Sequence, residues 1–282
     1  MRPLFLLSLL APAFVLASEE GVNPKATDLF EIGGIPVSNS ILTTWIIAVL
    51  IIVAVRLLVG TPKIIPNKGQ ALVENVASGL RDALEPIVGK KMIGKTFPVL
   101  CGFFVFILLM NWSGLLPGVG TIKYMTAEHG WQDAIRPANS DLNTTLALSV
   151  ISFLAWTYFV LRYAGVKVLI LDLFGNKADK KELSTPMWLM LGFIFLGVGG
   201  IEVLSIASRL ISLPFRLYGN VFGGENLIHT LGGIAPYIVP AIAGMLEVLV
   251  GLIQAFVFTL LSAVYIGLIC NHDAGHDEEH AH

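Results

Sequence analysis

The chain has 282 residues, of which 55% are hydrophobic and 13% are charged, and its formal net charge is −2. Soluble domains carry about 25% charged residues, so the composition excludes a water-soluble enzyme of this size, and the absence of a basic excess argues against nucleic-acid binding. The two cysteines, Cys101 and Cys270, cannot build a disulfide framework. The composition predicts an all-α, polytopic membrane protein.

Residues 1–18 have the features of a secretory signal peptide. Arg2 precedes an apolar stretch from Leu4 to Ala17 that ends in the small-residue pattern Val-Leu-Ala. This stretch is too short to cross about 30 Å of hydrocarbon, so we expect it to be cleaved. Residues 19–40 would then form an extracytoplasmic N-terminal segment. The alternative is an uncleaved helix that lies on the membrane.

Five later segments are apolar and long enough to cross a membrane. They cover about residues 41–59, 97–116, 145–163, 187–231 and 238–270. The fourth would form a helix about 67 Å long, whereas a perpendicular crossing needs about 20 residues. Splitting it would place Arg209 and Arg216 in an apolar turn, so we expect one tilted or bent helix. Helix breakers at residues 232–236 predict a turn, which makes the last two segments a long, strongly tilted hairpin.

The first loop contains apolar residues at helical spacing. They are Leu72, Val73, Val76, Leu80, Leu84, Ile87 and Val88. This pattern predicts an amphipathic helix on the cytoplasmic membrane surface. A helix packed against a soluble partner is the alternative.

Loop charges indicate how the chain is oriented in the membrane. Six Lys and Arg residues lie between the first two membrane segments and four between the third and fourth, against two between the second and third and none between the last two. Basic loops face the cytoplasm. The mature N-terminus is therefore expected outside, and the 271–282 tail inside. The tail carries His272, His276 and His280 at a spacing of four, but a solvated tail is more common than a metal site.

Ionisable side chains in the last two segments are costly in a bilayer and are typical of transport pathways. The charged or polar residues are Glu202, Arg209, Arg216, Asn220, Glu225, His229, Glu247 and Gln254. At about 100° per residue, Glu202, Arg209 and Arg216 share one helix face. Glu225 points almost opposite to Arg216, while Glu247 and Gln254 share a face of the last helix.

These residue types differ in what they can do with a proton. The Arg216 guanidinium stays protonated, so it can attract a deprotonated carboxylate but cannot relay protons. Glu225 and Glu247 can titrate and suit a water-filled proton path. The alternative is that Arg216 pairs with a glutamate and only holds helices together. Glycines at 219, 223 and 224 allow close approach of another backbone, either from this chain or from a partner.

Four stretches together resemble subunit a of the membrane sector of the proton-translocating ATP synthase, bacterial type. The main one is residues 213–225 (LPFRLYGNVFGGE). The others are residues 106–117 (FILLMNWSGLLP), 141–145 (DLNTT), and 254–258 (QAFVF) followed by Tyr265. They occur in the family's order, and the resemblance covers about residues 35–270, the membrane domain being residues 41–270.

The resemblance implies a stator proton-channel subunit that couples proton translocation to rotation of a c-subunit ring and to ATP synthesis. Arg216 matches the essential arginine that faces the ring carboxylate, and Gln254 matches the glutamine beside it. Asn220 and Glu202 match the cytoplasmic half-channel, and Glu225 the outer one. Glu247 stands where some members carry histidine, and His229 would suit the outer channel or simple packing.

The same resemblance implies the bacterial inner membrane as the location. The expected partners are the c-ring, the peripheral-stalk b subunits and the remaining synthase subunits. No cofactor, metal or catalytic residue of its own is expected. The coupling ion could be H⁺ or Na⁺, because the ion site lies mostly on the c subunit.

Two other function classes are possible for a charged membrane hairpin. A secondary transporter with Arg216 binding an anionic substrate would show internal repeats, and the charged C-terminal hairpin has no counterpart near the N-terminus. An intramembrane hydrolase would need a Ser/His/Asp set or a pair of metal ligands at membrane depth, which the sequence does not show.

Overall fold

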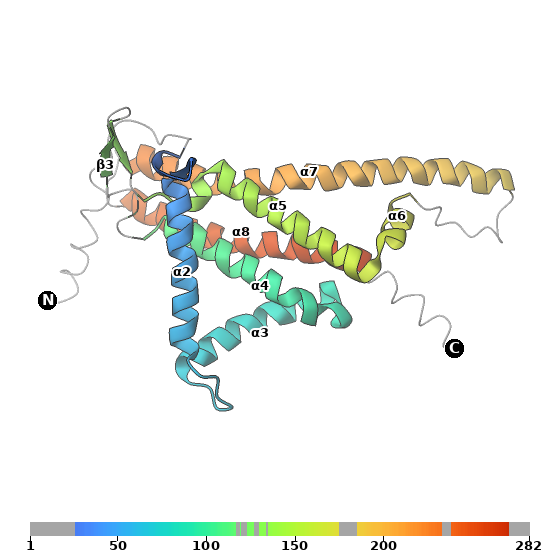
Figure 1. Ribbon diagram of the computed structural model, residues 1–282, viewed down its shortest axis with the longest axis horizontal. Coiled ribbons are helices and arrows are strands. Elements are labelled where there is room, and N and C mark those ends of the chain that lie inside the picture. The colour runs from blue at the N-terminus through green and yellow to red at the C-terminus, as the bar shows by residue number, and fades with distance from the viewer. Residues whose placement is uncertain are drawn as a thin grey trace. The chain divides into compact units, whose positions relative to one another are not determined.

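The computed structural model describes residues 26–116, 119, 123–126, 130–133, 135–174, 185–232 and 238–270. Its helices are α2 (Asn39–Val59), α3 (Lys68–Val88), α4 (Lys90–Ser113), α5 (Leu142–Phe159), α6 (Val166–Phe174), α7 (Thr185–Gly232) and α8 (Ile238–Cys270), as Figure 1 shows. A π-helical turn, η3 (Val160–Ala164), continues α5, and a short 3-10 helix, η2 (Ala138–Ser140), precedes it. Two antiparallel hairpins pair β1 (Asp28–Ile32) with β2 (Ile35–Ser38), and β3 (Lys123–Thr126) with β4 (Gly130–Asp133).

The predicted all-α, polytopic membrane class is confirmed. Within the described ranges, five helices are long and apolar enough to cross a membrane: α2, α4, α5 with η3, α7 and α8. The expected signal peptide, the turn at 233–236 and the 271–282 tail lie outside the described residues. The proposed division of the chain into these segments therefore stays a prediction.

The chain forms two compact units. In the described ranges, the first unit comprises residues 26–76, 102–147 and 214–258. The second unit comprises residues 77–101, 148–213 and 259–270. The boundaries between the units fall inside helices, so α3, α4, α5, α7 and α8 each contribute residues to both units.

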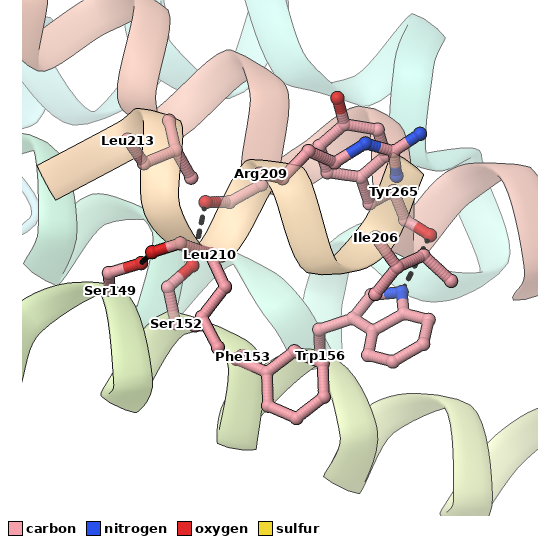
Figure 2. Close-up of a pocket in the computed structure, with 10 residues that line it drawn as sticks. Ser149, Ser152, Phe153, Trp156, Ile206, Arg209, Leu210, Leu213 and Tyr265 are labelled. Atoms are coloured by element: carbon pink, nitrogen blue, oxygen red, sulfur yellow. Dashed lines mark hydrogen bonds between the residues drawn. The ribbon is translucent and has the colours of Figure 1, made fainter. Parts of the chain in front are cut away.

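α7 is one unbroken helix of 48 residues, as the charge argument predicted. At 1.5 Å per residue it is about 72 Å long, so a crossing of the membrane requires tilt. Pro214 lies inside the helix and has no N–H to donate to the carbonyl of Leu210, four residues earlier. The Ser149 hydroxyl of α5 donates to that carbonyl instead, at 3.0 Å (Figure 2). A hydroxyl from another helix thus satisfies the group that proline leaves unpaired.

The first unit is held together by side chains of α4 that donate to main-chain carbonyls of α8. The Asn111 amide nitrogen donates to the Gly251 carbonyl at 3.0 Å, and the Trp112 indole donates to the Val248 carbonyl at 3.1 Å. Asn139 in η2 donates to the Asn111 amide oxygen at 2.7 Å. A Cβ at Gly251 would lie 3.1 Å from the Asn111 Cβ, so the glycine permits this close packing.

The N-terminal hairpin was not predicted from the sequence. Its turn is formed by Gly33 and Gly34, with φ angles of 61° and 82°, and such a two-glycine turn suits a two-residue hairpin loop. Ser40, in the first turn of α2, donates to Asp141 at 2.8 Å. This bond ties the start of α2 to the segment that opens α5.

The amphipathic helix in the first loop is confirmed as α3, but much of its apolar face packs inside the chain. Its buried residues in the second unit include Leu80, Leu84 and Val88. Leu72 and Val76, toward its N-terminus, are 59% and 45% exposed. The end of α3 contacts α8, where the Ile87 carbonyl lies against Gly267. A membrane-surface position therefore suits only the exposed N-terminal part.

Replacing Gly267 with alanine should destabilise the protein, because the new Cβ would collide with the Ile87 carbonyl. Over-packing of this kind costs about 1–3 kcal/mol. The matched control is Gly197→Ala on α7, where nothing lies within 4 Å of an added Cβ. That control should be neutral or slightly stabilising. Thermal unfolding of the purified protein in detergent would measure both variants, and equal midpoints would contradict the predicted contact.

Candidate functional site

The polar residues of the last two helices meet in the first unit, where α7 and α8 run antiparallel. The Asn220 amide of α7 donates to the Gln254 amide oxygen of α8 at 3.0 Å. Farther along α7, an added Cβ on Gly224 would lie 2.8 Å from a carboxylate oxygen of Glu247. The structure therefore confirms side-by-side packing of the predicted hairpin at these two levels.

Arg216 lies on an exposed face of α7 that also carries Gly219, Asn220 and Gly223; we call these four residues the open face. Residues three, four and seven apart line one side of a helix. Apart from the neighbouring backbone of α7 itself, no atom of the described residues lies within 4 Å of a Cβ added at Gly219 or Gly223. Arg216 forms no hydrogen bond or ion pair with any residue that the structure describes. Its charge is thus not used to join helices within the described chain.

Arg209, seven residues before Arg216 on the same helix, is in a different environment. In the second unit its guanidinium donates to the Ser205 hydroxyl at 3.0 Å and lies 3.5 Å from the centroid of the Tyr265 ring (Figure 2). Trp156 fixes α8 beside it by donating to the Tyr265 carbonyl at 3.1 Å. A cation over an aromatic ring is stabilised electrostatically. Arg209 is therefore a cation whose partners come from its own chain.

Serine hydroxyls and apolar side chains form a small cavity beside Arg209. Its volume is about 50 Å³, which is room for a few water molecules. Ser152 (Figure 2) and Ser262 both line this cavity and share a hydrogen bond of 2.9 Å. These contacts all belong to the second unit.

Gln254 is 5% exposed, and only part of its amide is satisfied by the described chain. Its oxygen accepts the bond from Asn220, whereas its nitrogen has no hydrogen-bond partner there. Leaving a buried donor unpaired costs about 1–3 kcal/mol. The nitrogen is thus a buried donor that the described chain leaves unsatisfied.

Glu225 lies close to Arg136, one of the two basic residues in the loop between the second and third membrane segments. Arg136, two residues before η2, places a guanidinium nitrogen 3.5 Å from a Glu225 carboxylate oxygen. The two side chains are 6% and 17% exposed, respectively. Arg136 was missed because a long stretch of chain separates it from Glu225, and no local spacing links a loop to the far end of a helix.

The Glu247 carboxylate lies against the α7 backbone at Gly224, the residue before Glu225. Gly224 is therefore part of the packing between α7 and α8, unlike the open Gly219 and Gly223. The three glycines that looked equivalent in sequence thus have two different roles. Only Gly219 and Gly223 leave a flat surface on the exposed face of α7.

The other predicted site residues are placed as follows. Glu202 is half-buried on α7 and belongs to the second unit. The backbone of His229 continues α7, but its side chain lies outside the described part of the chain, as do the tail histidines. Among the described residues, no three His, Cys, Asp or Glu side chains are arranged to hold a metal ion.

Comparison with known proteins identifies a family over most of the chain. The sequence model for the ATP synthase A chain matches residues 41–267. The ATP synthase subunit a 2 of Bradyrhizobium sp. strain BTAi1 is 29% identical over 242 residues, which cover 86% of this chain and 93% of that protein. The ATP synthase subunit a of Moorella thermoacetica is 30% identical over 243 residues, which cover 86% and 95%, respectively.

The contact between Arg136 and Glu225 predicts strong coupling in a double-mutant cycle. Arg136→Leu or Glu225→Leu alone should lower the free energy of unfolding by about 3–5 kcal/mol, because each removes one member of a buried ion pair. The double variant should cost less than the sum of the two. The control is the exposed pair Arg81 and Glu85, 3.6 Å apart, for which a coupling of about 0.5 kcal/mol or less is expected. Chemical denaturation measures all variants, and additive effects for Arg136 and Glu225 would contradict the pairing.

Proposed function

Because the chain belongs to the ATP synthase A chain family, we propose that it is the stator proton-channel subunit of a rotary ATP synthase. In this role it has no catalytic residue of its own. It provides the path by which protons reach and leave a rotating ring of c subunits, and this coupling drives ATP synthesis elsewhere in the complex. The coupling ion is proposed to be the proton.

The exposed and unpaired Arg216 is the observation that supports this role most directly. A charged side chain at the centre of a membrane helix costs at least about 2.5 kcal/mol, and a guanidinium cannot lose its proton to avoid that cost. A deprotonated carboxylate on a passing c subunit would supply the missing counter-charge. The flat backbone at Gly219 and Gly223 would let the helix that carries it come close.

Two half-channels are proposed on either side of Arg216. Glu225 lies about two turns of helix, or about 10 Å along the axis, from the end of α7, and would receive protons in the outer half-channel. Its contact with Arg136 would hold the carboxylate in place. Asn220 and Gln254, which lie between the levels of Arg216 and Glu225, and Glu202, which precedes Arg216 on α7, are each proposed to serve the path to the cytoplasm. The bond between Asn220 and Gln254 supports placing those two together.

Offset half-channels oblige each proton to travel with the ring before it can leave. One charge that crosses 100 mV releases about 2.3 kcal/mol, so several protons are needed for each ATP. Glu247, which lies against Gly224, the residue before Glu225, is proposed to share proton transfer with Glu225, and His229 to line the outer entrance. Coupled carboxylates titrate as a pair rather than as separate groups.

The surroundings of the subunit follow from the same proposal. The protein would lie in the bacterial inner membrane, with the mature N-terminus outside and the C-terminus in the cytoplasm, as the loop charges predict. Its partners would be the c-ring, the peripheral-stalk b subunits and the rest of the synthase. Exposed apolar residues over most of α2 suit contact with lipid or with such partners.

Replacing Arg216 with alanine should abolish ATP-driven proton pumping, because no permanent cation would meet the ring carboxylate. Passive proton leakage through the membrane sector is the expected side effect. The measurement is fluorescence quenching of a pH-sensitive dye in vesicles that contain the reconstituted synthase. The matched control is Arg209→Gln, whose parent side chain is held by Ser205 and Tyr265 and which should retain coupled pumping. Normal pumping in Arg216→Ala would refute the proposed role.

Replacing Glu225 with glutamine should slow proton translocation by roughly tenfold or more, because the amide cannot take up and release a proton. The measurement is the rate of proton uptake driven by an imposed potential, over a range of pH. Glu85→Gln on α3 removes the same charge outside the proposed path and should leave the rate unchanged. An unaltered rate in Glu225→Gln at every pH would count against the outer half-channel.

A further inference from the structure

The end of the third membrane helix has an unusual backbone. α5 passes into the π-helical turn η3, which ends at Gly165 with a φ of 87°. π-helical turns are rare and occur frequently at functional sites. This one brings Arg162 and Tyr163 to the exposed surface of the second unit, at the end of a membrane-spanning helix.

The Tyr163 ring carries two cations. The Lys95 ammonium nitrogen of α4 lies 4.1 Å from the ring centroid, and the Arg162 guanidinium carbon lies 5.7 Å from it. The ring is stacked on Phe159, with centroids 6.2 Å apart and planes 19° apart, and Phe159 is buried. The aromatic face is therefore a fixed platform that attracts positive charge.

The charge of this group is not neutralised within the described chain. Neither Lys95 nor Arg162 forms an ion pair with a described residue, and both side chains are exposed. Two like charges on one ring repel each other, so an anion held between them would relieve the repulsion. Lys167 follows closely in α6 and is also exposed, and Asp172 is the single acidic residue between 160 and 174.

An exposed apolar surface adjoins these cations. α6 has nine residues, which is too short to cross a membrane. Its exposed side chains include Val166, Ile170 and Leu171. A short apolar helix at the end of a membrane span suits a position in the interface between headgroups and acyl chains. Cations at headgroup level beside apolar side chains match the two halves of a phospholipid.

We propose that Lys95, Arg162 and Tyr163 bind the phosphate of an anionic phospholipid, whose acyl chains lie against α6. Basic pockets at the ends of membrane helices are recognised sites for such headgroups. A free inorganic phosphate shares the anion chemistry but would make no use of the exposed apolar residues of α6, so the lipid is the favoured ligand. The site is separate from the proposed proton path and does not depend on it.

Photo-crosslinking on the intact synthase complex tests this site. The complex is reconstituted in phosphatidylcholine vesicles with a trace of photoactivatable phosphatidylglycerol, and labelled peptides are identified by mass spectrometry. Labelling is expected within residues 160–174. The double variant K95Q/R162Q should reduce it by about thirtyfold, since each of the two cations near an anionic lipid contributes about 1 kcal/mol. The control K63Q/K68Q removes two exposed charges elsewhere and should leave labelling unchanged.

Three further measurements test the lipid site. The first asks whether binding needs the positive charges, the second whether it is selective for anionic lipid, and the third whether it needs the acyl chains. The charge-preserving variant K95R/R162K should keep most of the labelling, and its loss to the level of K95Q/R162Q would overturn a role for charge. Equal labelling by photoactivatable phosphatidylcholine would overturn selectivity for anionic lipid. Competition by millimolar inorganic phosphate would show that the free anion is the ligand instead. Because labelling is measured without proton transport, the result stands apart from the proposed channel function.

Discussion

A permanent charge in a membrane helix is costly without a partner, and this constraint shapes the candidate site. Three arginines differ in how far the described chain supplies one. Arg209 lies on the Tyr265 ring, and Arg136 lies beside the Glu225 carboxylate. Arg216 has neither within the described chain and faces outward over two bare glycines. A guanidinium in a membrane helix is costly without a counter-charge, and the proposed c-subunit carboxylate would supply one.

The helices could be predicted from the sequence because their signals are local. Long apolar runs identify membrane helices directly. The continuity of α7 followed from one further observation, that Arg209 and Arg216 could not lie in an apolar turn. The face shared by Arg216 and Asn220 followed from helical geometry alone. Composition and spacing were sufficient wherever the answer depended on one element at a time.

Contacts between distant segments could not be predicted in this way. Nothing near Pro214 shows that the Ser149 hydroxyl takes over the Leu210 carbonyl, and nothing near Glu225 shows that Arg136 lies beside it. The two short hairpins were missed because strands of four or five residues carry too weak a pattern. The different roles of Gly223 and Gly224 depend on which side of α7 is covered, and that is a property of the packed fold.

The bare backbone at Gly219 and Gly223 has a mechanical consequence for the proposed role. Two helices normally settle in one register because side chains of each lock into gaps on the other. Gly219 and Gly223 offer no side chain to lock against, so a helix that passes over these two positions would meet little steric resistance there. The two glycines that would let a c-subunit helix come close enough to meet Arg216 would also let that helix move past. A stationary subunit beside a rotating ring needs both properties.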